Sequence, residues 1–315
     1  MITINDWLKD APRPGPRSVM TVGVFDGLHL GHQFLVKKTI ARARELNVPS
    51  LVLTFAPHPL AVLSPSGAPE ILTTVSQKRE ILQGLGLSTL GVLRFDEAMS
   101  ALAPEAFLNE VIAPRVLPVE ILIGPDFRFG KNAEGHFDLL KAWGKTRGIK
   151  TLAVPIQETL GGETISSSHA RGLIKIGHVE AVAKILGRPY RIEGEVVKGQ
   201  RRGRTLGFPT ANLGKMEQLL PGPGVYAALA RLRGKVFAAM TSIGHNPTFK
   251  GRYLTVESYL LDFSDNCYGE KLEVDFIQRV RGVIRFETVE ALVAQLREDE
   301  IKARSVLRDF LGTIA

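Results

Sequence analysis

The feature that most constrains the fold is a change in hydrophobic pattern near Gly187-Arg188-Pro189. Before this point, short apolar runs bounded by turn residues alternate with longer segments of helical period. After it, the apolar runs are β-rich and several are joined by short turns. The first pattern predicts a parallel sheet covered on both faces, and the second predicts a small β-barrel or sandwich. We therefore expect two domains, residues 1–187 and 188–315, which suits the length of 315 residues.

The first half has the strand–helix succession of a Rossmann-like α/β domain. Its predicted strands are 19–25, 50–55, 89–93, 119–123 and 150–154. Its predicted helices are 34–46, 77–85, 103–112 and 139–147. Ligands of such sheets bind beyond the carboxyl ends of the strands, so the loops that follow the strands are candidate sites.

The second half contains predicted strands followed by one amphipathic helix. The strands are 190–197, 225–232, 235–243, 254–263 and 271–280, and the helix covers about 289–311. Within the last strand, Leu272 and Val274 alternate with Glu273 and Asp275, the two-residue period of a half-buried antiparallel strand. We expect a small antiparallel β-barrel domain with a C-terminal helix.

Composition excludes several classes of protein. Hydrophobic residues make up 44% and charged residues 23%, so the chain is neither disordered nor fibrous. No segment reaches the ~18 consecutive apolar residues that cross a bilayer, and a start containing Asp6 and Asp10 is unlike a secretory signal. The only cysteine, Cys267, can form no intrachain disulfide, which suits the reducing cytosol. We expect a cytoplasmic protein without a membrane partner.

The net charge of +8 and the isoelectric point of about 9.6 indicate an anionic partner. Nucleic acids, acidic membranes and phosphorylated metabolites all meet this description. The densest basic cluster, Lys198 to Arg204, is short and rich in glycine. Charge alone therefore does not distinguish RNA from ATP, and the motifs must decide.

The first predicted strand leads into a motif rich in glycine and histidine, Gly23-Val24-Phe25-Asp26-Gly27-Leu28-His29-Leu30-Gly31-His32. Gly27 and Gly31 permit a tight turn and the close approach of a phosphate to the backbone. The helix that follows offers unpaired N–H groups and the positive end of its dipole to an anion. His29 and His32 flank a glycine, so both imidazoles can face one phosphate. Such fixed donors stabilise the charge that develops when an α-phosphate is attacked.

This motif resembles the signature of the cytidylyl/adenylyl-transferase superfamily, whose His-x-Gly-His loop binds a nucleotide triphosphate. The longer match is to the prokaryotic FAD synthetase module, which implies adenylylation of FMN by ATP to give FAD and pyrophosphate. The resemblance implies catalytic roles for His29 and His32. It implies contacts with ATP or its phosphates for Gly23, Phe25, Asp26, Gly27 and Gly31.

Two further segments resemble flavin-side parts of the same module. Residues 54–59 (Thr-Phe-Ala-Pro-His-Pro) are similar to its Pro-His-Pro segment, and residues 124–130 (Gly-Pro-Asp-Phe-Arg-Phe-Gly) to its flavin loop. The side chains expected to bind flavin are His58, Asp126, Phe127 and Phe129. The carboxylate can accept hydrogen bonds, while each phenylalanine can either cover an isoalloxazine or belong to the hydrophobic core.

Residues 165–171 (Ile-Ser-Ser-Ser-His-Ala-Arg) are similar to the module's Ile-Ser-Ser-Thr-x-Ile-Arg motif. Taken alone, this segment would be an ordinary serine-rich helix cap. The resemblance implies that hydroxyls and helix-start N–H groups hold the β- and γ-phosphates of ATP, with an arginine forked onto oxygens. The implied ligands are Ser166, Ser167, Ser168 and Arg171. Ser168 keeps the hydroxyl of the usual threonine, whereas Ala170 removes apolar bulk beside Arg171.

In the second domain the basic cluster belongs to a glycine-punctuated loop, Gly199-Gln200-Arg201-Arg202-Gly203-Arg204-Thr205-Leu206-Gly207-Phe208-Pro209-Thr210-Ala211-Asn212. Backbone amides freed by glycine can cradle phosphates. Thr210 and Asn212 supply neutral oxygens, which suit Mg²⁺ because it is a hard ion. An RNA-binding loop would equally explain the arginines. The segment instead resembles the riboflavin kinase signature, which implies phosphate contacts for Gly199, Gly207, Thr210 and Asn212 and Mg²⁺ ligation by Thr210 and Asn212.

Downstream segments match the same riboflavin kinase family, namely 223–227, 243–249, 256–263 and 268–269. By this match Glu257 is the catalytic carboxylate, which accepts the proton of the ribityl 5′-OH during attack on the γ-phosphate. The alternative is that Glu257 is a solvent-facing residue of an amphipathic strand. Arg281, together with the terminal helix, fits the family's flavin-side cover and is expected to bind flavin.

Together the resemblances cover about residues 18–310 and imply a bifunctional enzyme. It would convert riboflavin to FMN and FMN to FAD, with ATP as co-substrate and Mg²⁺ in both steps, and with no nucleic-acid partner. One alternative is a basic nucleic-acid-binding protein, since class I aminoacyl-tRNA synthetases also carry His-x-Gly-His. No Lys-Met-Ser-Lys-Ser-like loop accompanies it here. The other alternative is a non-catalytic flavin-binding module, against which His29, His32 and Arg171 argue.

Overall fold

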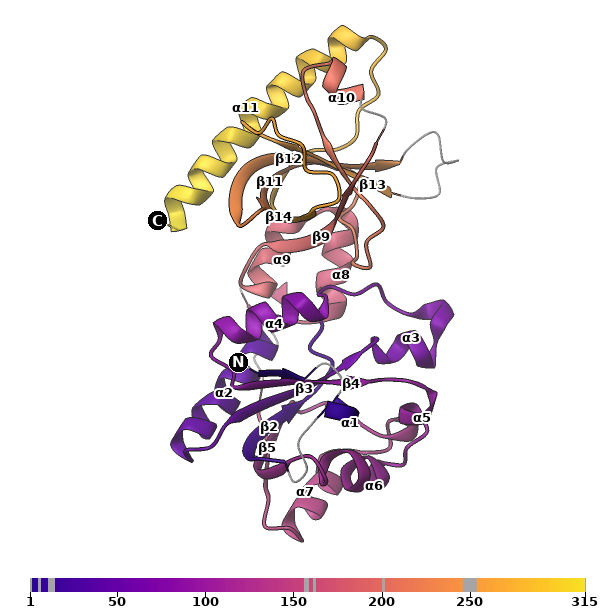
Figure 1. Cartoon of the computed structure of the whole chain (residues 1–315), viewed down its shortest axis with the longest axis vertical. Coiled ribbons are helices and arrows are strands. Elements are labelled where there is room, and N and C mark those ends of the chain that lie inside the picture. Colours follow the sequence, from indigo (N-terminus) through magenta and orange to yellow (C-terminus); the bar gives the residue numbers. More distant parts are fainter. Residues whose placement is uncertain are drawn as a thin grey trace. The chain divides into compact units, whose positions relative to one another are not determined.

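The computed structural model describes residues 2–4, 7–10, 15–155, 159–160, 163–199, 202–245 and 254–314. The chain forms two compact units, Met1–Ile165 and Ser166–Ala315. In Figure 1 the first unit is coloured indigo to magenta and the second pink to yellow. Gln200, Arg201 and residues 246–249, which belong to the predicted kinase motifs, lie outside the described residues.

The first unit is built on a sheet of six parallel strands in the order β1-β4-β3-β2-β5-β6. The strands are β1 (Ile2–Ile4), β2 (Arg17–Val22), β3 (Ser50–Ala56), β4 (Thr89–Arg94), β5 (Leu117–Ile123) and β6 (Lys150–Ala153). From β2 the chain builds outward in both directions, so the switch point where such sheets bind ligands lies at the carboxyl ends of β2 and β5. The predicted Rossmann-like fold is confirmed.

Helices cover both faces of this sheet (Figure 1). One face carries α2 (Leu30–Glu45) and α4 (Val75–Gly84), and the other carries α1 (Trp7–Asp10), α6 (Pro104–Ala106), the π-helix η2 (Phe107–Ile112) and α7 (Phe137–Lys145). Val19 packs into one core cluster with Leu35, while its neighbour Met20 packs into the other with Phe107. Residues 18–22 of β2 are therefore buried, with side chains packed on both faces of the sheet.

Shorter elements fill the connections of the first unit. They are α3 (Pro59–Leu63), η1 (Pro65–Gly67), α5 (Glu97–Ser100), η3 (Lys131–Ala133), β7 (Thr159–Leu160) and β8 (Glu163–Thr164). The two helices predicted at 34–46 and 77–85 begin earlier, at Leu30 and Val75, because His29 and Thr74 cap them.

The second unit is built on a closed antiparallel barrel in the order β10-β13-β12-β11-β14-β9. The strands are β9 (Tyr190–Val197), β10 (Ala211–Leu213), β11 (Gly224–Leu232), β12 (Lys235–His245), β13 (Leu254–Leu260) and β14 (Lys271–Arg281). Its helices are α8 (Ser167–Ile176), α9 (Val179–Leu186), α10 (Arg202–Thr205) and α11 (Val289–Ile314). The predicted barrel with a C-terminal helix is confirmed.

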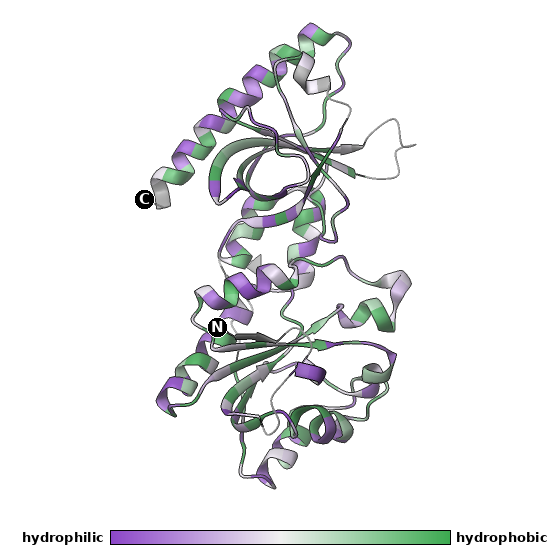
Figure 2. Ribbon diagram, in the orientation of Figure 1, coloured by the Kyte–Doolittle hydropathy of each residue, from purple (hydrophilic) through white to green (hydrophobic). Residues whose placement is uncertain are grey.

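The long helix α11 packs along the outside of the barrel (Figure 1). Ala303 and Leu307 are buried against Val225 and Met240. Figure 2 shows hydrophobic and hydrophilic residues alternating along α11, as expected for a helix with one buried face. The barrel therefore buries apolar side chains on its outer surface as well as inside.

Strand β14 departs from strict alternation at Ile277, which is only 9% exposed. Ala227 pairs with Gln278 and Ala228 pairs with Phe276, so Ile277 is the extra residue of a β-bulge. The bulge turns Ile277 toward the cluster under α11. This explains why an apolar residue stands where the two-residue period calls for a polar one.

Helices α8 and α9 belong to the second unit. The N–H of Gly222 donates to the carbonyl of Ile174 at 2.9 Å, and Arg279 donates to the carbonyl of Ile176 at 3.1 Å. The boundary expected near residue 187 coincides with the end of α9, where Gly187 has a φ of 68°. The second compact unit begins at Ser166, before α8 and α9. The predicted domain bounds, 1–187 and 188–315, therefore stay a prediction.

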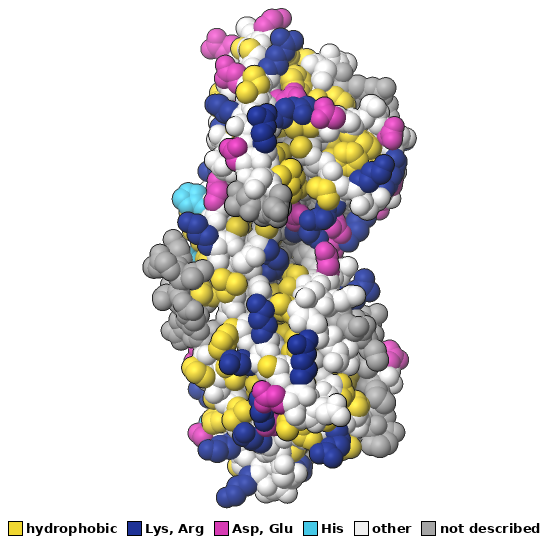
Figure 3. Space-filling model, turned by 90° about the vertical axis from the view of Figure 1, so that its left-hand side faces the viewer, with side chains coloured by type: hydrophobic (Ala, Val, Ile, Leu, Met, Phe, Trp, Pro, Cys, Tyr) yellow, Lys and Arg dark blue, Asp and Glu magenta, His cyan; other side chains and the backbone are white. Residues whose placement is uncertain are grey.

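Basic residues are not gathered into one patch on the face of the molecule drawn in Figure 3. On the face drawn in Figure 3, Lys and Arg side chains are interspersed with acidic and apolar ones. Arginines of the second unit form ion pairs, such as Arg191 with Asp275 at 2.6 Å. Across the described stretches of the chain, no helix combines the length and the apolar character that a bilayer span requires.

Candidate active sites

The loop between β2 and α2 has an unusual backbone. Phe25, Gly27 and Leu28 have φ angles of 50°, 78° and 42°, all in the left-handed region. Glycine adopts this region freely, whereas Phe25 and Leu28 are strained there by roughly 1–3 kcal/mol each. Their side chains are 2% and 0% exposed in the core beneath α2, so burial offsets the strain. Burial of these two side chains therefore stabilises a single backbone conformation of the loop.

His29 and His32 lie against each other at the start of α2. Their rings stack with centroids 3.6 Å apart, and Nδ1 of His29 accepts a hydrogen bond from the N–H of His32 at 3.3 Å. Burial lowers the pKa of His32 well below its usual value, and His29 and Lys78 lower it further. His32 is therefore uncharged near neutral pH. Its buried Nδ1 has no hydrogen-bond partner among the described residues.

Asp26 is 3% exposed and anchors the loop from below. Its carboxylate accepts hydrogen bonds from the N–H groups of Leu72 and Thr73 at 3.0 and 3.1 Å. The Thr73 hydroxyl in turn accepts from the N–H of Gly27 at 3.0 Å. These contacts give Asp26 a structural role, and its negative charge would repel a phosphate. The expected contact of Asp26 with ATP stays a prediction.

Sequence reasoning missed Lys78 of α4, whose side chain is buried beneath the same loop. Its Nζ donates to the carbonyl of Val24 at 2.8 Å and to Oγ1 of Thr54 at 3.4 Å. Burial lowers the pKa of Lys78 to about 8, although Asp26 opposes the shift. The available signal was its position four residues before Leu82, on the buried face of a predicted helix.

The expected flavin residues of the first unit follow β3 and β5. His58 caps α3, where its Nδ1 accepts from the N–H of Leu60 at 3.2 Å, and Asp126 is exposed. Phe127 and Phe129 stack with centroids 5.5 Å apart. Phe129 is 7% exposed within the core cluster, whereas Phe127 is only partly buried against it. Phe127 is therefore the better placed of the two to meet a ligand.

The expected triphosphate motif lies in the second unit. Ser166 is the N-cap of α8, and its Oγ accepts from the N–H of His169 at 3.1 Å. Ser167 and Arg171 are half-buried and Ser168 is exposed. Because these residues and the two histidines belong to different units, the single nucleotide site expected from the sequence stays a prediction.

In the barrel, Glu257 of β13 meets two residues of the glycine-rich loop. Its Oε2 accepts a hydrogen bond from Oγ1 of Thr210 at 3.1 Å. Asn212 of β10 pairs with Glu257 across the strands. A Cβ at Gly199 would lie 2.5 Å from the Asn212 amide, so a larger residue there would force this side chain to shift. Glu257 is half-buried and in contact with Thr210, one of the predicted Mg²⁺ ligands, and its catalytic role stays a prediction.

A largely apolar pocket of about 320 Å³ opens beside Glu257. Its lining includes Phe208, Tyr259, Phe286, Thr210 and Arg281. Arg281 is held by Asp299, which is 0% exposed, through hydrogen bonds of 2.8 and 3.0 Å. An apolar cavity with few polar groups suits a planar aromatic ligand.

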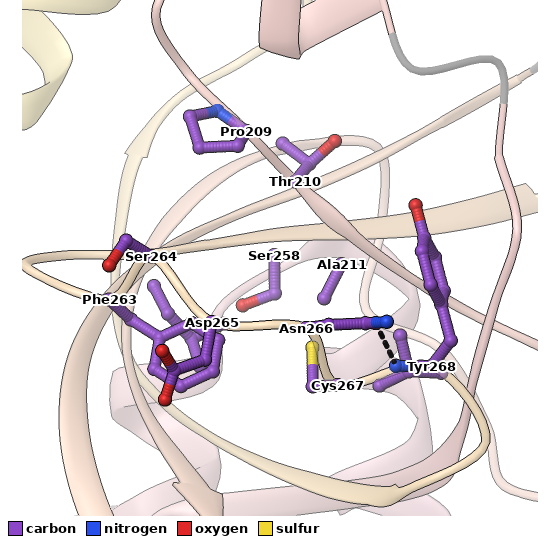
Figure 4. A pocket seen from close by; sticks show the side chains of 12 residues that line it. Pro209, Thr210, Ala211, Ser258, Phe263, Ser264, Asp265, Asn266, Cys267 and Tyr268 are labelled. Atoms are coloured by element: carbon purple, nitrogen blue, oxygen red, sulfur yellow. Dashed lines mark hydrogen bonds between the residues drawn. The ribbon is translucent and has the colours of Figure 1, made fainter.

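A second pocket, of about 440 Å³, lies on another side of Thr210. Figure 4 shows Pro209 and Thr210 on one side of this pocket and the turn from Asn266 to Tyr268 on the other. Oδ1 of Asn266 accepts a hydrogen bond from the N–H of Tyr268 at 3.0 Å. Thr210 lines both pockets, so the two cavities meet at the residue that contacts Glu257. Much of this lining lies in the segments that match the riboflavin kinase family, whereas Ser264 to Cys267 lie outside them and were not predicted.

The barrel site contains oxygen donors suited to a hard cation. Among the described residues, no three His, Cys, Asp or Glu side chains cluster as metal ligands. The Thr210 hydroxyl nevertheless contacts the Glu257 carboxylate, and Asn212 of β10 lies opposite Glu257 of β13. These are ligand types that Mg²⁺ accepts when it also keeps water and phosphate oxygens, so the residues fit this ion.

Comparison with known proteins assigns both units to families. Residues 12–169 match the family model described as FAD synthetase, and residues 186–307 match the one described as riboflavin kinase. The bifunctional riboflavin kinase/FMN adenylyltransferase of Listeria monocytogenes is 39% identical over 291 residues, 91% of each chain. The proteins of the same description from Haemophilus influenzae and Escherichia coli are 33% and 34% identical, covering 95% and 94% of this chain and 97% and 94% of theirs.

A solved structure from Streptococcus pneumoniae, named as a macrolide-efflux protein, has a closely similar fold. Its TM-score is 0.84 at 33% identity, and the match covers 96% of this chain and 99% of that one. The α/β unit and the barrel unit therefore both have counterparts in that structure.

Proposed function

The chain belongs to the family of bifunctional riboflavin kinases/FMN adenylyltransferases, and on this premise we propose how its residues carry the two reactions. Its activities are riboflavin kinase and FMN adenylyltransferase. Riboflavin, FMN and ATP are its substrates. The kinase reaction belongs to the barrel and the adenylyl transfer to the α/β domain, in keeping with the residues that the two family models match.

In the kinase, riboflavin occupies the apolar pocket and ATP the pocket of Figure 4. The observation that carries this proposal is Thr210, which lines both pockets and donates to Glu257. The ribityl 5′-OH must lose a proton as it attacks the γ-phosphate. Glu257 accepts that proton, and Arg281, held by Asp299, helps to orient the flavin.

Mg²⁺ would be held by Thr210 and Asn212, with ATP oxygens and water completing its coordination. When bound, the ion neutralises charge on the transferring phosphoryl group. Gly199 and Gly207 expose backbone amides to the phosphates. The support is the close approach of Gly199 to Asn212 and the left-handed φ of 83° at Gly207.

In the adenylyltransferase, His29 and His32 donate hydrogen bonds to the α-phosphate of ATP while FMN attacks it. Because Nδ1 of His29 accepts a hydrogen bond, the proton of neutral His29 is on Nε2. The unpartnered Nδ1 of His32 supports a ligand contact at this site. Gly31 and the start of α2 add backbone donors, and the serine motif with Arg171 holds the outer phosphates. The flavin is met by Phe127 and Asp126. Both steps consume ATP, which supports a cytosolic location. The substrates of both steps are small molecules.

The test supplies full-length protein with either riboflavin or FMN, together with ATP and Mg²⁺, and separates the flavins by chromatography. Wild-type protein should form FMN and then FAD from riboflavin, and EDTA should stop both steps. Thr210→Val removes the hydroxyl common to both pockets and should slow riboflavin phosphorylation by about tenfold or more, with FAD formation from FMN unchanged. Normal phosphorylation by Thr210→Val would overturn this placement of the kinase site.

A further inference from the structure

Lys78 is a buried cation without an ion pair. Its side chain is 5% exposed, and in the described part of the chain its Nζ bonds only the Val24 carbonyl and the Thr54 hydroxyl. No carboxylate lies within ion-pair distance of Nζ there, although Asp26 is near enough to act on its pKa. Burying an ammonium without a paired carboxylate is costly, and an apolar residue of the same length would avoid that cost. Stability therefore does not explain this lysine.

Two donors from different elements converge on one carbonyl oxygen. Oγ1 of Thr54, from β3, donates to the Val24 carbonyl at 2.9 Å, and Nζ of Lys78, from α4, donates to the same atom at 2.8 Å. Val24 immediately precedes the strained residues that lead to His29. Fixing this carbonyl therefore fixes the start of the loop that carries both imidazoles.

We propose that Lys78 is a positioning residue for adenylyl transfer, which holds the Val24 carbonyl and so orients His29 and His32 toward the α-phosphate. This inference rests on the proposed role of the two histidines. A displacement of about 1 Å in such a site can cost roughly a hundredfold in rate.

The positive charge of Lys78 has a second effect at the same site. The charged or titratable groups that act on His32 are His29 at the start of α2 and Lys78 on α4, while Asp26 in the loop acts on Lys78. Since a neighbouring cation disfavours protonation, removing the ammonium should raise the pKa of His32. The acid-side inflection in the pH profile of FAD synthesis should then move to higher pH.

The experiment compares Lys78→Met with Arg79→Met, an exposed neighbour on the same helix, in the full-length protein. FAD formation from FMN and FMN formation from riboflavin are measured on the same preparations, together with Tm. For Lys78→Met we expect kcat of adenylylation to fall about a hundredfold and KM values to change little. Riboflavin phosphorylation should be retained, and Tm should stay the same or rise. Arg79→Met should match the wild type throughout.

Thr54→Val removes the other donor to Val24 and leaves the charge in place. It should lower kcat by a smaller factor, about tenfold, without moving the acid-side inflection. Wild-type adenylylation by Lys78→Met overturns the proposal, as does a parallel loss of Tm and of both activities, which would indicate a structural role. Should Lys78→Met not fold, wild-type adenylylation by Thr54→Val overturns it.

The histidine variants separate this inference from the proposed function. If alanine at both His29 and His32 leaves FAD synthesis intact, the proposed site itself is wrong. If the histidine variants are inactive and Lys78→Met is active, only this inference is refuted.

Discussion

The two candidate sites are assembled in different ways. In the α/β unit, His29 and His32 come from one loop between consecutive elements, and their rings stack at 3.6 Å. In the barrel, Thr210 and Glu257 are 47 residues apart in the sequence and meet because β10 pairs with β13. The first site depends on a strained backbone segment, and the second depends on strand register.

This difference determines what supports each site. Phe25 and Leu28 keep their left-handed conformations because their side chains are buried, and Asp26 and Lys78 fix the loop from beneath. The barrel site uses regular strands, and Gly199 at the start of the glycine-rich loop closely approaches Asn212. Substitutions beneath the first loop should therefore act on chemistry at a distance, whereas substitutions in the barrel site should act through direct contacts.

The largest effect is expected from Glu257→Gln. This variant tests whether the two sites work independently, because a group shared by both would make both activities fall. The glutamine keeps the hydrogen bond from Thr210 but cannot accept the substrate proton. Riboflavin phosphorylation should fall roughly a hundred- to ten-thousandfold. FAD formation from added FMN should proceed at the wild-type rate, measured by chromatography of the flavins.

The outcomes for Glu257→Gln separate chemistry from folding. Normal riboflavin phosphorylation would show that Glu257 has only a structural role on β13. Loss of activity with both riboflavin and FMN would indicate misfolding, which circular dichroism detects.

The reciprocal change replaces His29 and His32 with alanine. Removal of a preorganised donor typically costs a hundred- to thousandfold, so FAD formation should nearly cease while FMN accumulates from riboflavin. The flavins are again separated by chromatography. Undiminished FAD synthesis would show that these imidazoles do not contact the reacting phosphate.

The sequence predicted the architecture well where its signals are local. Turn-bounded apolar runs and helical periods located most of the strands and the helices α2, α4, α7 and α11, whereas α8 and α9 were not predicted. Strand β10 (Ala211–Leu213) was missed because only pairing with β9 and β13 makes three residues a strand. The strand predicted at 19–25 ends at Val22, because Phe25 is apolar for packing beneath α2 rather than for extension of the sheet.

Within the sites, motifs identified residues but not their tertiary contacts. The spacing of His29 and His32 predicted their proximity correctly, since a helix start brings such residues together. The bond between Thr210 and Glu257 depends on barrel register, and the bond between Lys78 and Val24 spans 54 residues. Neither belongs to a contiguous motif. A lysine on the buried face of a helix would have been a usable but weak signal.

The pH dependence of the free energy of unfolding tests whether the buried charge of Lys78, beneath the first site, destabilises the folded state. Lys78 has a pKa of about 8 in the folded state against an ordinary value of 10.5. The unfolded chain therefore binds more protons between pH 8 and 10.5, and this group makes the folded state more stable as pH rises through that window. The wild type should gain up to about 3 kcal/mol relative to Lys78→Met.

Tryptophan fluorescence during urea unfolding can measure this gain at pH 7.5 and 10.5. Trp7 and Trp143 are the only tryptophans of the chain and both belong to the first unit, so the signal is specific to it. Differences taken against Lys78→Met cancel the titration of other groups. Equal pH dependence in the two proteins would mean that Lys78 titrates normally in the folded state.

Truncation tests where the barrel domain begins. Residues 188–315 should fold and phosphorylate riboflavin, but they lack α8 and α9, whose Ile174 and Val182 are fully buried. The fragment 166–315 retains those residues and the bond from Arg279 to Ile176. We expect its Tm to exceed that of 188–315 by roughly 5 °C or more. Equal Tm values would place the boundary at residue 187, and FAD synthesis by either fragment would contradict the domain assignment.

Gly199→Ala should have the smallest effect and tests whether the barrel site acts through direct contacts. The new Cβ would lie 2.5 Å from the Asn212 amide, so this side chain must shift. If Asn212 holds Mg²⁺ and ATP, riboflavin phosphorylation should fall about tenfold, mainly through a higher KM for ATP–Mg²⁺, because a displaced ligand weakens binding before it alters the proton transfer to Glu257. Gly244→Ala on β12 is the matched control, since its Cβ meets no atom within 4 Å. A lower Tm with an unchanged KM would assign Asn212 to barrel packing alone, and the barrel site would then depend on Thr210 and Glu257.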